Sequence, residues 1–220
     1  MSTAPKKKIF LIRHGQSKGN IDKTFQDEHD PLTPCGRIQA HKVAQRARAL
    51  KPEIILTSPM VRALETARAI EKETNVPLEL HESLREYLVP SRLFNKPIAS
   101  KESNEYHTEL FKNMYDPNWR YEDAESYFDL HNRSLEVIGI LKNRPEERIL
   151  VVSHGAFMSI LISTMMTEGV PDPIGATRMS RFLKKKNTGV TIIDYTEQHA
   201  IANKWRLTVW NDYTHLIEEE

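Results

Sequence analysis

Residues 9–17 read Ile9-Phe10-Leu11-Ile12-Arg13-His14-Gly15-Gln16-Ser17, and the rest of the fold is organised around them. Four apolar residues, two of them β-branched, predict a buried strand that delivers an arginine and a histidine into a loop opened by Gly15. A guanidinium can hold two phosphate oxygens in a planar fork while a neutral imidazole nitrogen attacks phosphorus. A histidine after a strand is more often an ordinary core or loop residue, so this stretch alone does not establish catalysis.

Length and charge limit the classes of protein to consider. The chain has 220 residues, which we expect to form a single unit with a sizeable core, residues 1–220, carrying an insertion. A net charge of +1 provides no field over the whole molecule that would attract nucleic acid or a membrane surface. The single cysteine, Cys35, cannot form an internal disulfide; it suits a reducing compartment, and we expect it to be inert.

Two apolar stretches could be mistaken for targeting or membrane segments. Three lysines precede the first strand, but its apolar run ends at Arg13 and is too short for an export signal. The longer stretch over residues 149–166 is interrupted by Ser153-His154-Gly155, which predicts a buried strand followed by a buried helix. We therefore expect a cytoplasmic protein.

Strands and helices alternate along the first part of the chain. After a polar, loop-like stretch at residues 16–32, Pro34 lies in the first turn of a helix predicted from about Thr33 to Leu50. Short strands are predicted over residues 53–57 and 78–80. Between them, Ser58 is predicted to cap a helix that has Pro59 at its first position. This alternation indicates parallel β-α-β units, in which ligands gather at the carboxyl ends of the strands.

Residues 84–121 break the alternation. They contain several prolines and aromatic residues without sustained periodicity, which predicts a cap inserted at about residues 87–121. Further elements are predicted after it: a helix over residues 122–142 with Leu130, Val137, Ile138 and Leu141 on its inner face, a strand over 148–153, a helix over 156–167, and strands near 190–195 and 205–210. The expected fold is a three-layer α/β/α sandwich with a mostly parallel central sheet and a cap over the carboxyl ends of the strands.

The candidate chemistry lies at the ends of three predicted strands. An apolar strand ending in a His-Gly pair occurs twice, at His14 and at His154, and both imidazoles meet if these strands are neighbours. The strand that ends before Ser58 leads into a helix carrying Arg62. Helix-terminal N–H groups, such as those of Gly15 or Gly155, add donors. Two imidazoles and two guanidiniums without metal-ligand spacing favour phosphate over zinc.

Five motifs follow one another along most of the chain. They are Leu11-Ile12-Arg13-His14-Gly15-Gln16-Ser17-Lys18-Gly19-Asn20, Leu32-Thr33-Pro34-Cys35-Gly36-Arg37-Ile38-Gln39-Ala40, Ser58-Pro59-Met60-Val61-Arg62-Ala63-Leu64-Glu65-Thr66-Ala67, Leu84-Arg85-Glu86 and Val152-Ser153-His154-Gly155. In sequence and in order, these motifs resemble the histidine phosphatase superfamily, the phosphoglycerate mutase-like enzymes.

The resemblance implies a role for each matching residue. His14 would be the phosphorylated nucleophile and Glu86 the general acid and base. Arg13, Arg62 and His154 would bind and neutralise the phosphoryl group. The remaining residues expected at the substrate site are Asn20, Gln16, Ser17 and Gly155. The resemblance also implies that the enzyme needs no metal and no cofactor.

Elementary chemistry agrees with these roles. Positive charge around His14 disfavours its protonation, so the ring stays neutral and able to attack, while His154 is expected to be protonated. The ring of donors would stabilise the equatorial oxygens of the transition state. An alkoxide leaves poorly, so Glu86 must give it a proton, which requires partial burial and a nearby phosphate anion. The resulting carboxylate would activate the water that cleaves the phosphohistidine.

Departures from the mutases favour a phosphatase. Glu86 is followed by Tyr87-Leu88-Val89-Pro90, where phosphoglycerate mutases usually have Arg-His-Tyr-Gly, and Ala124-Glu125-Ser126 stands in place of Gly-Glu-Ser. Residues 187–191 are more like the phosphatase branch. We therefore expect a histidine acid phosphatase-type hydrolase of phosphomonoesters. The alternatives are a phosphoglycerate mutase using 2,3-bisphosphoglycerate, and a non-catalytic phospho-ligand-binding protein, although the latter would be expected to lack one of the five catalytic candidates.

Partners and two surface features complete the predictions. We expect a small phosphorylated metabolite as substrate and no nucleic-acid or membrane partner. Whether the chain forms a homodimer is left open. The basic run over residues 181–186 is predicted to be a solvated turn. Trp119, Tyr121, Tyr127 and Phe128 are predicted to pack the cap against the rest of the chain.

Overall fold

The computed structural model describes residues 7–197 and 204–217 and is built on one six-stranded sheet. Its strands are β1 (Lys7–Arg13), β2 (Ile54–Thr57), β3 (Leu78–Leu80), β4 (Arg148–Ser153), β5 (Val190–Tyr195) and β6 (Trp205–Asp212). They lie in the order β3-β2-β4-β1-β5-β6. The four strands from β3 to β1 run parallel, whereas β5 is antiparallel to β1 and β6 to β5. The prediction of a mostly parallel sheet is confirmed.

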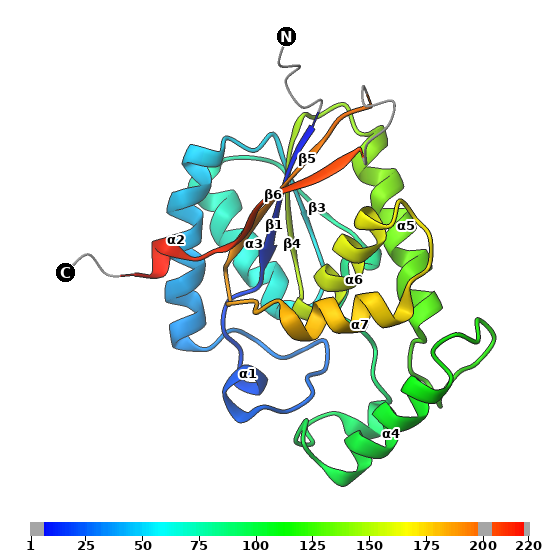
Figure 1. The fold of residues 1–220 in the computed structure, drawn as a ribbon. Helices are drawn as coiled ribbons and strands as arrows, with labels where there is room; N and C mark the ends of the chain where they lie inside the picture. Colours follow the sequence, from blue (N-terminus) through cyan, green and yellow to red (C-terminus); the bar gives the residue numbers. More distant parts are fainter. Residues whose placement is uncertain (1–6, 198–203, 218–220) are drawn as a thin grey trace.

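Helices cover both faces of this sheet, as Figure 1 shows, with α2 and α3 on one side and α5, α6 and α7 on the other. The helices are α1 (Lys18–Asp22), α2 (Pro34–Leu50), α3 (Val61–Thr74), α4 (Lys101–Lys112), α5 (Tyr127–Asn143), α6 (Gly155–Met166) and α7 (Pro173–Phe182), with short 3₁₀ turns η1 (Glu82–Leu84), η2 (Ser91–Leu93) and η3 (Thr214–Leu216). None of the described helices combines the length and the apolar character needed to cross a membrane.

The central strand β1 shows why the chain folds in three layers. Ile9 and Leu11 belong to the core under α5 and α6, whereas Phe10 and Ile12 belong to the core under α2 and α3. All four side chains are at most 1% exposed, which explains the uninterrupted apolar run, because a strand buried on both faces has no polar side. Burial of each such side chain stabilises the fold by about 1.5–3 kcal/mol.

Local hydrogen bonds decide where the helices begin. The prediction for α2 is confirmed: Thr33 caps it by accepting from the backbone N–H of Gly36, and Pro34 opens it. The helix predicted from residue 122 begins instead at Tyr127, because Ser126 and Asp129 form a reciprocal capping box there. All four residues predicted on the inner face of this helix are buried.

Other predictions about helices were wrong. Helix α3 begins at Val61, not at Pro59, because the Ser58 hydroxyl accepts from the backbone N–H of Met60 within a turn. The stretch 16–32, predicted as loop, contains the short helix α1. Helix α7 occurs in a part of the chain for which the sequence predicted no element, and it begins where the Asp172 side chain accepts from the N–H of Gly175.

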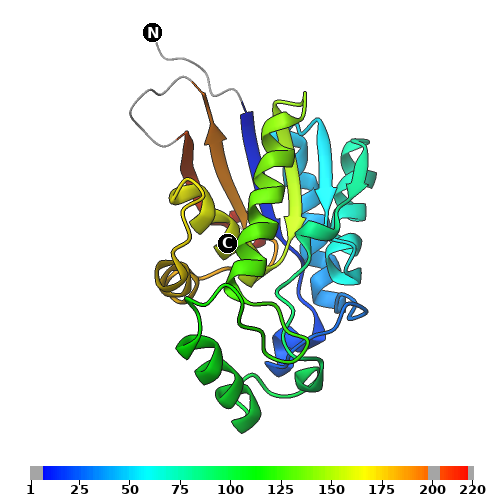
Figure 2. The ribbon, with the colours of Figure 1, turned by 90° about the vertical axis from the view of Figure 1, so that its right-hand side faces the viewer.

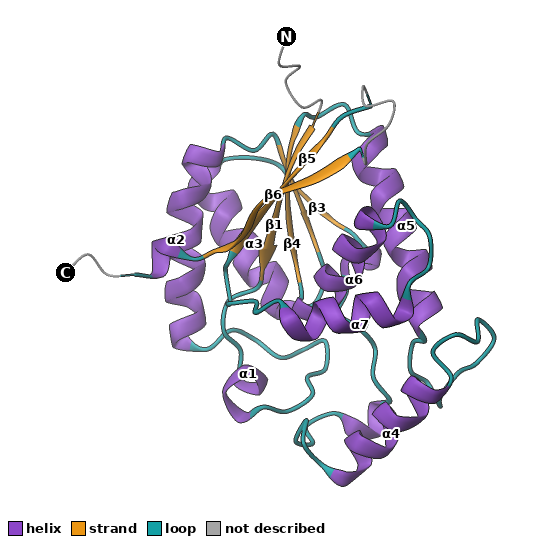
Figure 3. Ribbon diagram, in the orientation of Figure 1, coloured by secondary structure: helices purple, strands orange, loops and turns teal. Residues whose placement is uncertain are grey.

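Residues 87–121 lie beyond the carboxyl ends of the parallel strands, below them in Figure 2. Loops make up much of this segment, joined to η2 and α4, as Figure 3 shows. A small separate core holds it together, formed by Val89, Leu93, Tyr106 and Ala124 with partly buried aromatic neighbours that include Tyr121. Tyr127 and Phe128 pack instead in and against the main core. Backbone bridges at Thr24–Pro97 and Phe25–Phe94 attach the segment to the loop after α1.

Candidate active site

Three parallel strands end side by side and bring the candidate residues together. Arg13 at the end of β1 is level with Ser153 at the end of β4, and β2 follows on the other side of β4. The backbone N–H of His14 donates to the carbonyl oxygen of Ser153 over 3.0 Å. The rings of His14 and His154 consequently lie with their centroids 5.1 Å apart, so the predicted meeting of the two imidazoles is confirmed as geometry.

His14 is buried, 2% exposed, and oriented by one hydrogen bond. Its Nδ1 lies 2.7 Å from the carbonyl oxygen of Gly15. A carbonyl only accepts, so Nδ1 carries the proton and Nε2 carries the lone pair. Burial, together with the charges of Arg62 and Arg13, holds the pKa of His14 well below its usual value of 6.5. The ring is therefore neutral near pH 7, with Nε2 as its nucleophilic atom.

His154 is fully buried, and its surroundings oppose the expected charge. Its Nε2 lies 2.8 Å from the Ser58 hydroxyl. Burial and the nearby Arg62 lower the pKa of His154 well below 6.5, which opposes the predicted protonation. The reason is that an imidazolium here would lose its hydration while facing two guanidiniums. Its Nδ1 is buried and has no hydrogen-bond partner among the described residues.

The two arginines are anchored by backbone carbonyls, and each leaves its buried Nε unused. Arg62, 1% exposed, donates from one terminal nitrogen to the carbonyl of Asp27 over 2.6 Å. Arg13 donates to the carbonyl of Lys185 over 2.7 Å. Within the described part of the chain, the buried Nε of each arginine has no partner. An unpaired buried donor costs about 1–3 kcal/mol, so each arginine retains an unsatisfied donor that suits an anion.

A cavity of about 410 Å³ adjoins His14 and the two arginines, whereas His154 is not among its lining residues; Arg13, His14, Arg62, Glu86, Asn20 and Asn187 are among the residues that line it. The Asn20 side-chain oxygen accepts from the N–H of Ser17 over 3.2 Å and from the Asn187 amide over 2.9 Å. Asn187 also donates to the carbonyl oxygen of His14 over 2.9 Å. Sequence reasoning used Asn187 only as a marker of the phosphatase branch and missed that it fixes the backbone of His14.

Gln16, Ser17 and Gly155 are not among the residues that line this cavity, and their part in substrate binding stays a prediction. Gln16 bonds to Thr33 at the start of α2, and Ser17 donates its hydroxyl to Gln26. Gly155 opens α6 against the guanidinium of Arg13, where an added Cβ would lie 3.4 Å from Nε. The backbone N–H of Gly15, predicted as a further donor at the site, already donates to the Thr66 hydroxyl. These residues shape the site without lining it.

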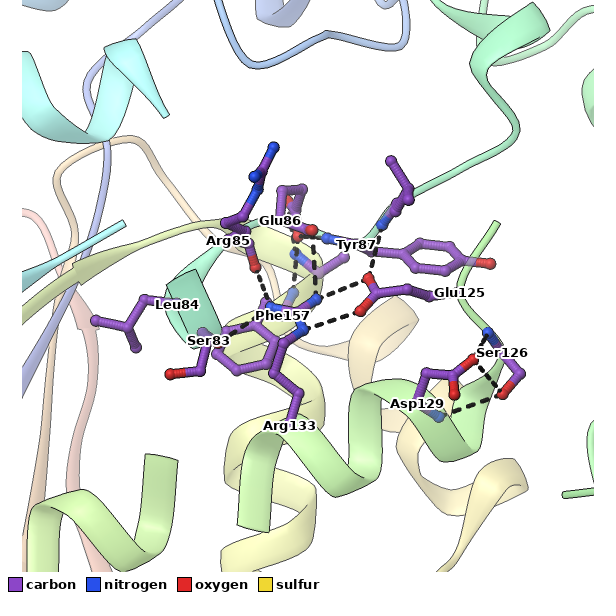
Figure 4. A network of polar contacts seen from close by, with 12 residues as sticks. Ser83, Leu84, Arg85, Glu86, Tyr87, Glu125, Ser126, Asp129, Arg133 and Phe157 are labelled. Atoms are coloured by element: carbon purple, nitrogen blue, oxygen red, sulfur yellow. Dashed lines mark hydrogen bonds and ion pairs between the residues drawn. The ribbon is translucent and has the colours of Figure 1, made fainter. Parts of the chain in front are cut away.

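Glu86 lies where two cavities meet. Its carboxylate accepts from the backbone N–H groups of Tyr87 and Phe157, each over 2.9 Å, and of Ala156 over 3.2 Å. Ala156 and Phe157 belong to the first turn of α6, whose end stabilises negative charge. Glu86 lines both the cavity beside His14 and a neighbouring cavity of about 600 Å³. Figure 4 shows this carboxylate and the contacts below it.

Lys185 is the exception to the predicted solvated run over residues 181–186, since Arg181, Lys184 and Lys186 are exposed as expected. Its ammonium donates to the Ser159 hydroxyl over 2.6 Å and to the carbonyl of Ser180 over 3.0 Å. Burial lowers the pKa of Lys185 to about 8. Its own carbonyl holds Arg13, so this lysine supports the site from behind.

Among the described residues, no group of three or more His, Cys, Asp or Glu side chains could hold a metal ion.

Comparisons with known proteins agree with this geometry. The family model described as histidine phosphatase superfamily (branch 1) matches residues 9–212. The chain is 32% identical over 212 residues to a probable phosphoglycerate mutase GpmB of Enterobacter sp. (strain 638), covering 94% of each chain. Among solved structures, it is similar to phosphoserine phosphatase of Entamoeba histolytica in complex with 3-phosphoglyceric acid, with a TM-score of 0.77, 25% identity and coverage of 96% and 100%. The same four values describe its similarity to YhfR of Bacillus stearothermophilus.

Proposed function

The chain belongs to the histidine phosphatase superfamily, and we propose that it is a metal-independent phosphomonoester hydrolase acting through a phosphohistidine on His14. One observation carries this proposal. A neutral imidazole with its lone pair on Nε2 lines one cavity with Arg13 and Arg62 and lies beside the ring of His154; the buried Nε atoms of both arginines and the Nδ1 of His154 have no hydrogen-bond partner among the described residues. That arrangement suits a phosphoryl group, a tetrahedral dianion whose phosphorus is open to attack by Nε2.

In the first half-reaction, Nε2 of His14 attacks phosphorus, the N–P bond forms and the P–O bond to the leaving group breaks. The guanidiniums of Arg13 and Arg62 stabilise the charge on the equatorial oxygens. Ser58, by donating its hydroxyl proton to Nε2 of His154, leaves that ring a proton on Nδ1 for a phosphoryl oxygen. Asn20 belongs to the same phosphate pocket, since its side chain lines the cavity.

Glu86 supplies the proton that the leaving oxygen needs. Its position between the two cavities supports this role, because a leaving group extending from the phosphate cavity into the neighbouring one passes the carboxyl group. In the second half-reaction, the Glu86 carboxylate takes a proton from water as the oxygen of that water bonds to phosphorus. The P–N bond breaks, inorganic phosphate is released, and both His14 and Glu86 regain their starting states.

The segment at residues 87–121 is, in this proposal, a cap that shapes the pocket for the leaving group. Tyr87, Leu88 and Phe94 from this segment line the neighbouring cavity. A small phosphorylated metabolite is therefore the proposed substrate. A cytoplasmic location and a homodimer stay predictions.

The test is hydrolysis of 4-nitrophenyl phosphate in the presence of a chelator, with acid-labile phosphoprotein measured in parallel. His14→Ala should lower kcat by roughly 10⁴-fold or more and abolish the phosphoprotein, since no other nucleophile occupies its position. The matched control is His131→Ala, which removes another imidazole that is 2% exposed, in α5, and should retain phosphoprotein formation. Turnover that survives in His14→Ala, or that requires an added divalent metal, contradicts the proposal.

A phosphoglycerate mutase is the second candidate, favoured by the name of the curated relative at 32% identity. The binding of 3-phosphoglyceric acid by the phosphoserine phosphatase agrees with either activity. A long-lived phosphohistidine, stimulation by 2,3-bisphosphoglycerate and interconversion of phosphoglycerates would favour the mutase. A protein that shows neither turnover nor phosphorylation would instead be a non-catalytic phospho-ligand-binding protein.

A further inference from the structure

Arg133, on α5, reaches the backbone of the segment that carries Glu86. One of its terminal nitrogens donates to the carbonyl oxygens of Ser83 over 3.0 Å and Arg85 over 2.6 Å. The other donates to the carbonyl of Glu86 itself over 3.4 Å. Figure 4 shows the guanidinium lying below this segment. Three carbonyls within four residues are therefore tied to one rigid, planar group.

Glu125 fixes the guanidinium from the other side. Its carboxylate pairs with Nε of Arg133 over 2.9 Å and with a terminal nitrogen over 2.8 Å, a bidentate arrangement. The same carboxylate accepts from the backbone N–H of Leu88 over 2.9 Å, and the N–H of Glu125 donates to the carbonyl of Leu88 over 2.9 Å. The segment is thus held both before and after Glu86.

A second contact links Arg133 to the Glu86 side chain. The guanidinium carbon lies 4.3 Å from the centre of the Phe157 ring, at a distance typical of a cation–π contact. The backbone N–H of Phe157 is one of the donors to the Glu86 carboxylate. Arg133 therefore contacts the backbone that carries Glu86 and also the residue that holds its carboxylate.

The hydrogen bonds of Arg133 leave nothing for a substrate. Its guanidinium has five N–H donors, and the described acceptors are the three carbonyls and the two Glu125 oxygens. Both Glu125 oxygens are occupied as well. Although the two side chains line the neighbouring cavity, their polar atoms point to each other and to the Glu86 segment.

We propose that Arg133, oriented by Glu125, is a positioning residue that fixes the Glu86 carboxyl group at the junction of the two cavities. The inference rests on the proposed function, because a fixed carboxyl group affects the rate only where a leaving oxygen must be protonated. Arg133 then acts on the substrate only through Glu86. Lysine cannot replace it, because an ammonium has three donors without the planar fork that reaches five acceptors.

The leaving group provides the specific readout. 4-Nitrophenolate departs with little help from a proton, whereas phenolate from phenyl phosphate needs more. Arg133→Lys and Glu125→Gln should lower kcat/KM for phenyl phosphate at least about 10-fold more than for 4-nitrophenyl phosphate. The ratio of the two kcat/KM values is independent of the fraction of enzyme that is folded, so partial misfolding does not obscure the result.

The chain offers a matched control directly after the same helix. Arg144 follows the last residue of α5, forms ion pairs with Glu79 and Glu146, and its side chain is 18% exposed against 15% for Arg133. Arg144→Lys therefore makes the same substitution in a similar ionic setting, and it should leave the substrate ratio unchanged. Adding Arg133→Lys to Glu86→Gln should change the ratio no further, because the carboxyl group is already gone.

The possible results distinguish a failure of the positioning role of Arg133 from a failure of the proposed phosphatase function. Equal losses on both phenyl phosphates in Arg133→Lys and Glu125→Gln, in an enzyme whose turnover depends on His14, would overturn the positioning role alone. A further change of ratio in the Glu86→Gln background would also overturn it. Turnover that does not depend on His14 would contradict the proposed function whatever the ratio shows.

Discussion

Replacing Gly36 by alanine should destabilise the protein, although alanine is the better helix former by about 1 kcal/mol. Gly36 lies in the first turn of α2 and faces the loop that follows His14. A Cβ built on Gly36 would lie 2.0 Å from the carbonyl oxygen of Gln16 and 2.9 Å from its carbonyl carbon. Close carbon–oxygen contacts lie at about 3.3 Å, so the two backbones would have to separate by about 1.3 Å.

The cost follows from that displacement. Overpacking of this kind costs about 1–3 kcal/mol. Separation also weakens the bond from the N–H of Thr33 to the carbonyl of Gln16, now 2.9 Å, which contributes about 1 kcal/mol. After the gain in helix propensity, a net loss of about 1–3 kcal/mol remains, which for a chain of this length lowers Tm by about 2–12 °C. Activity should fall as well, because Gln16 is two residues from His14.

Gly139→Ala makes the same substitution where nothing opposes it. Gly139 lies within α5, and an added Cβ there meets no atom within 4 Å. Helix propensity should raise its stability by about 0.5–1 kcal/mol, which is about 1–4 °C in Tm. Thermal melting of both variants, with 4-nitrophenyl phosphatase activity, tests the pair. A Gly36→Ala protein that melts at or above the wild type would refute the steric argument.

Three further predictions concern the supports of the site. Ser58→Ala removes the partner of Nε2 of His154 and should lower kcat/KM about 5- to 100-fold, measured with 4-nitrophenyl phosphate; an unchanged rate would contradict the orienting role. Asn187→Ala, which frees the His14 carbonyl and Asn20, should cost about 1–3 kcal/mol in urea unfolding, and a loss below 0.5 kcal/mol would count against it. The folded pKa values of His14 and His154 lie below the unfolded value. Their contribution to stability is therefore fully present above about pH 6.5. As the pH decreases from there, the free energy of unfolding falls by up to about 1.4 kcal/mol per pH unit for each histidine. His154→Gln should make this slope shallower by up to one proton, and an identical slope would show that His154 is protonated in the folded state.

The sequence predicted the sheet because its strands carry their own signals. The run from Ile9 to Ile12 is apolar without alternation, as a strand covered on both faces requires, and Arg148–Ser153 repeats the pattern. Parallel pairing of these strands then brings the two His-Gly turns together. The meeting of Arg13, His14 and His154 could therefore be predicted from strand ends, whereas Glu86 was assigned only through the resemblance to the family.

What the sequence could not predict depends on contacts between distant residues. The charge of His154 is set by burial beside Arg62, which no local pattern reports. Lys185 looks like part of a solvated run, but its ammonium donates a hydrogen bond to the hydroxyl of Ser159 on α6. From the sequence alone, Arg133 is an ordinary charged residue on a helix. Its hydrogen bonds to the carbonyl oxygens of Ser83 and Arg85 form only when the chain is folded.

The central position of β1 has a consequence for how the chain reaches its fold. Arg13 pairs in register with Ser153, 140 residues further along, and Ile12 with Val190 on the other side. At about 5–20 residues per second, ribosomal synthesis leaves the first strand without its β4 partner for roughly 7–28 seconds. Such long-range pairing also slows folding from the denatured state. His14 is thus among the first residues made, but the candidate site forms only once β1 has paired with β4 and brought His14 beside His154.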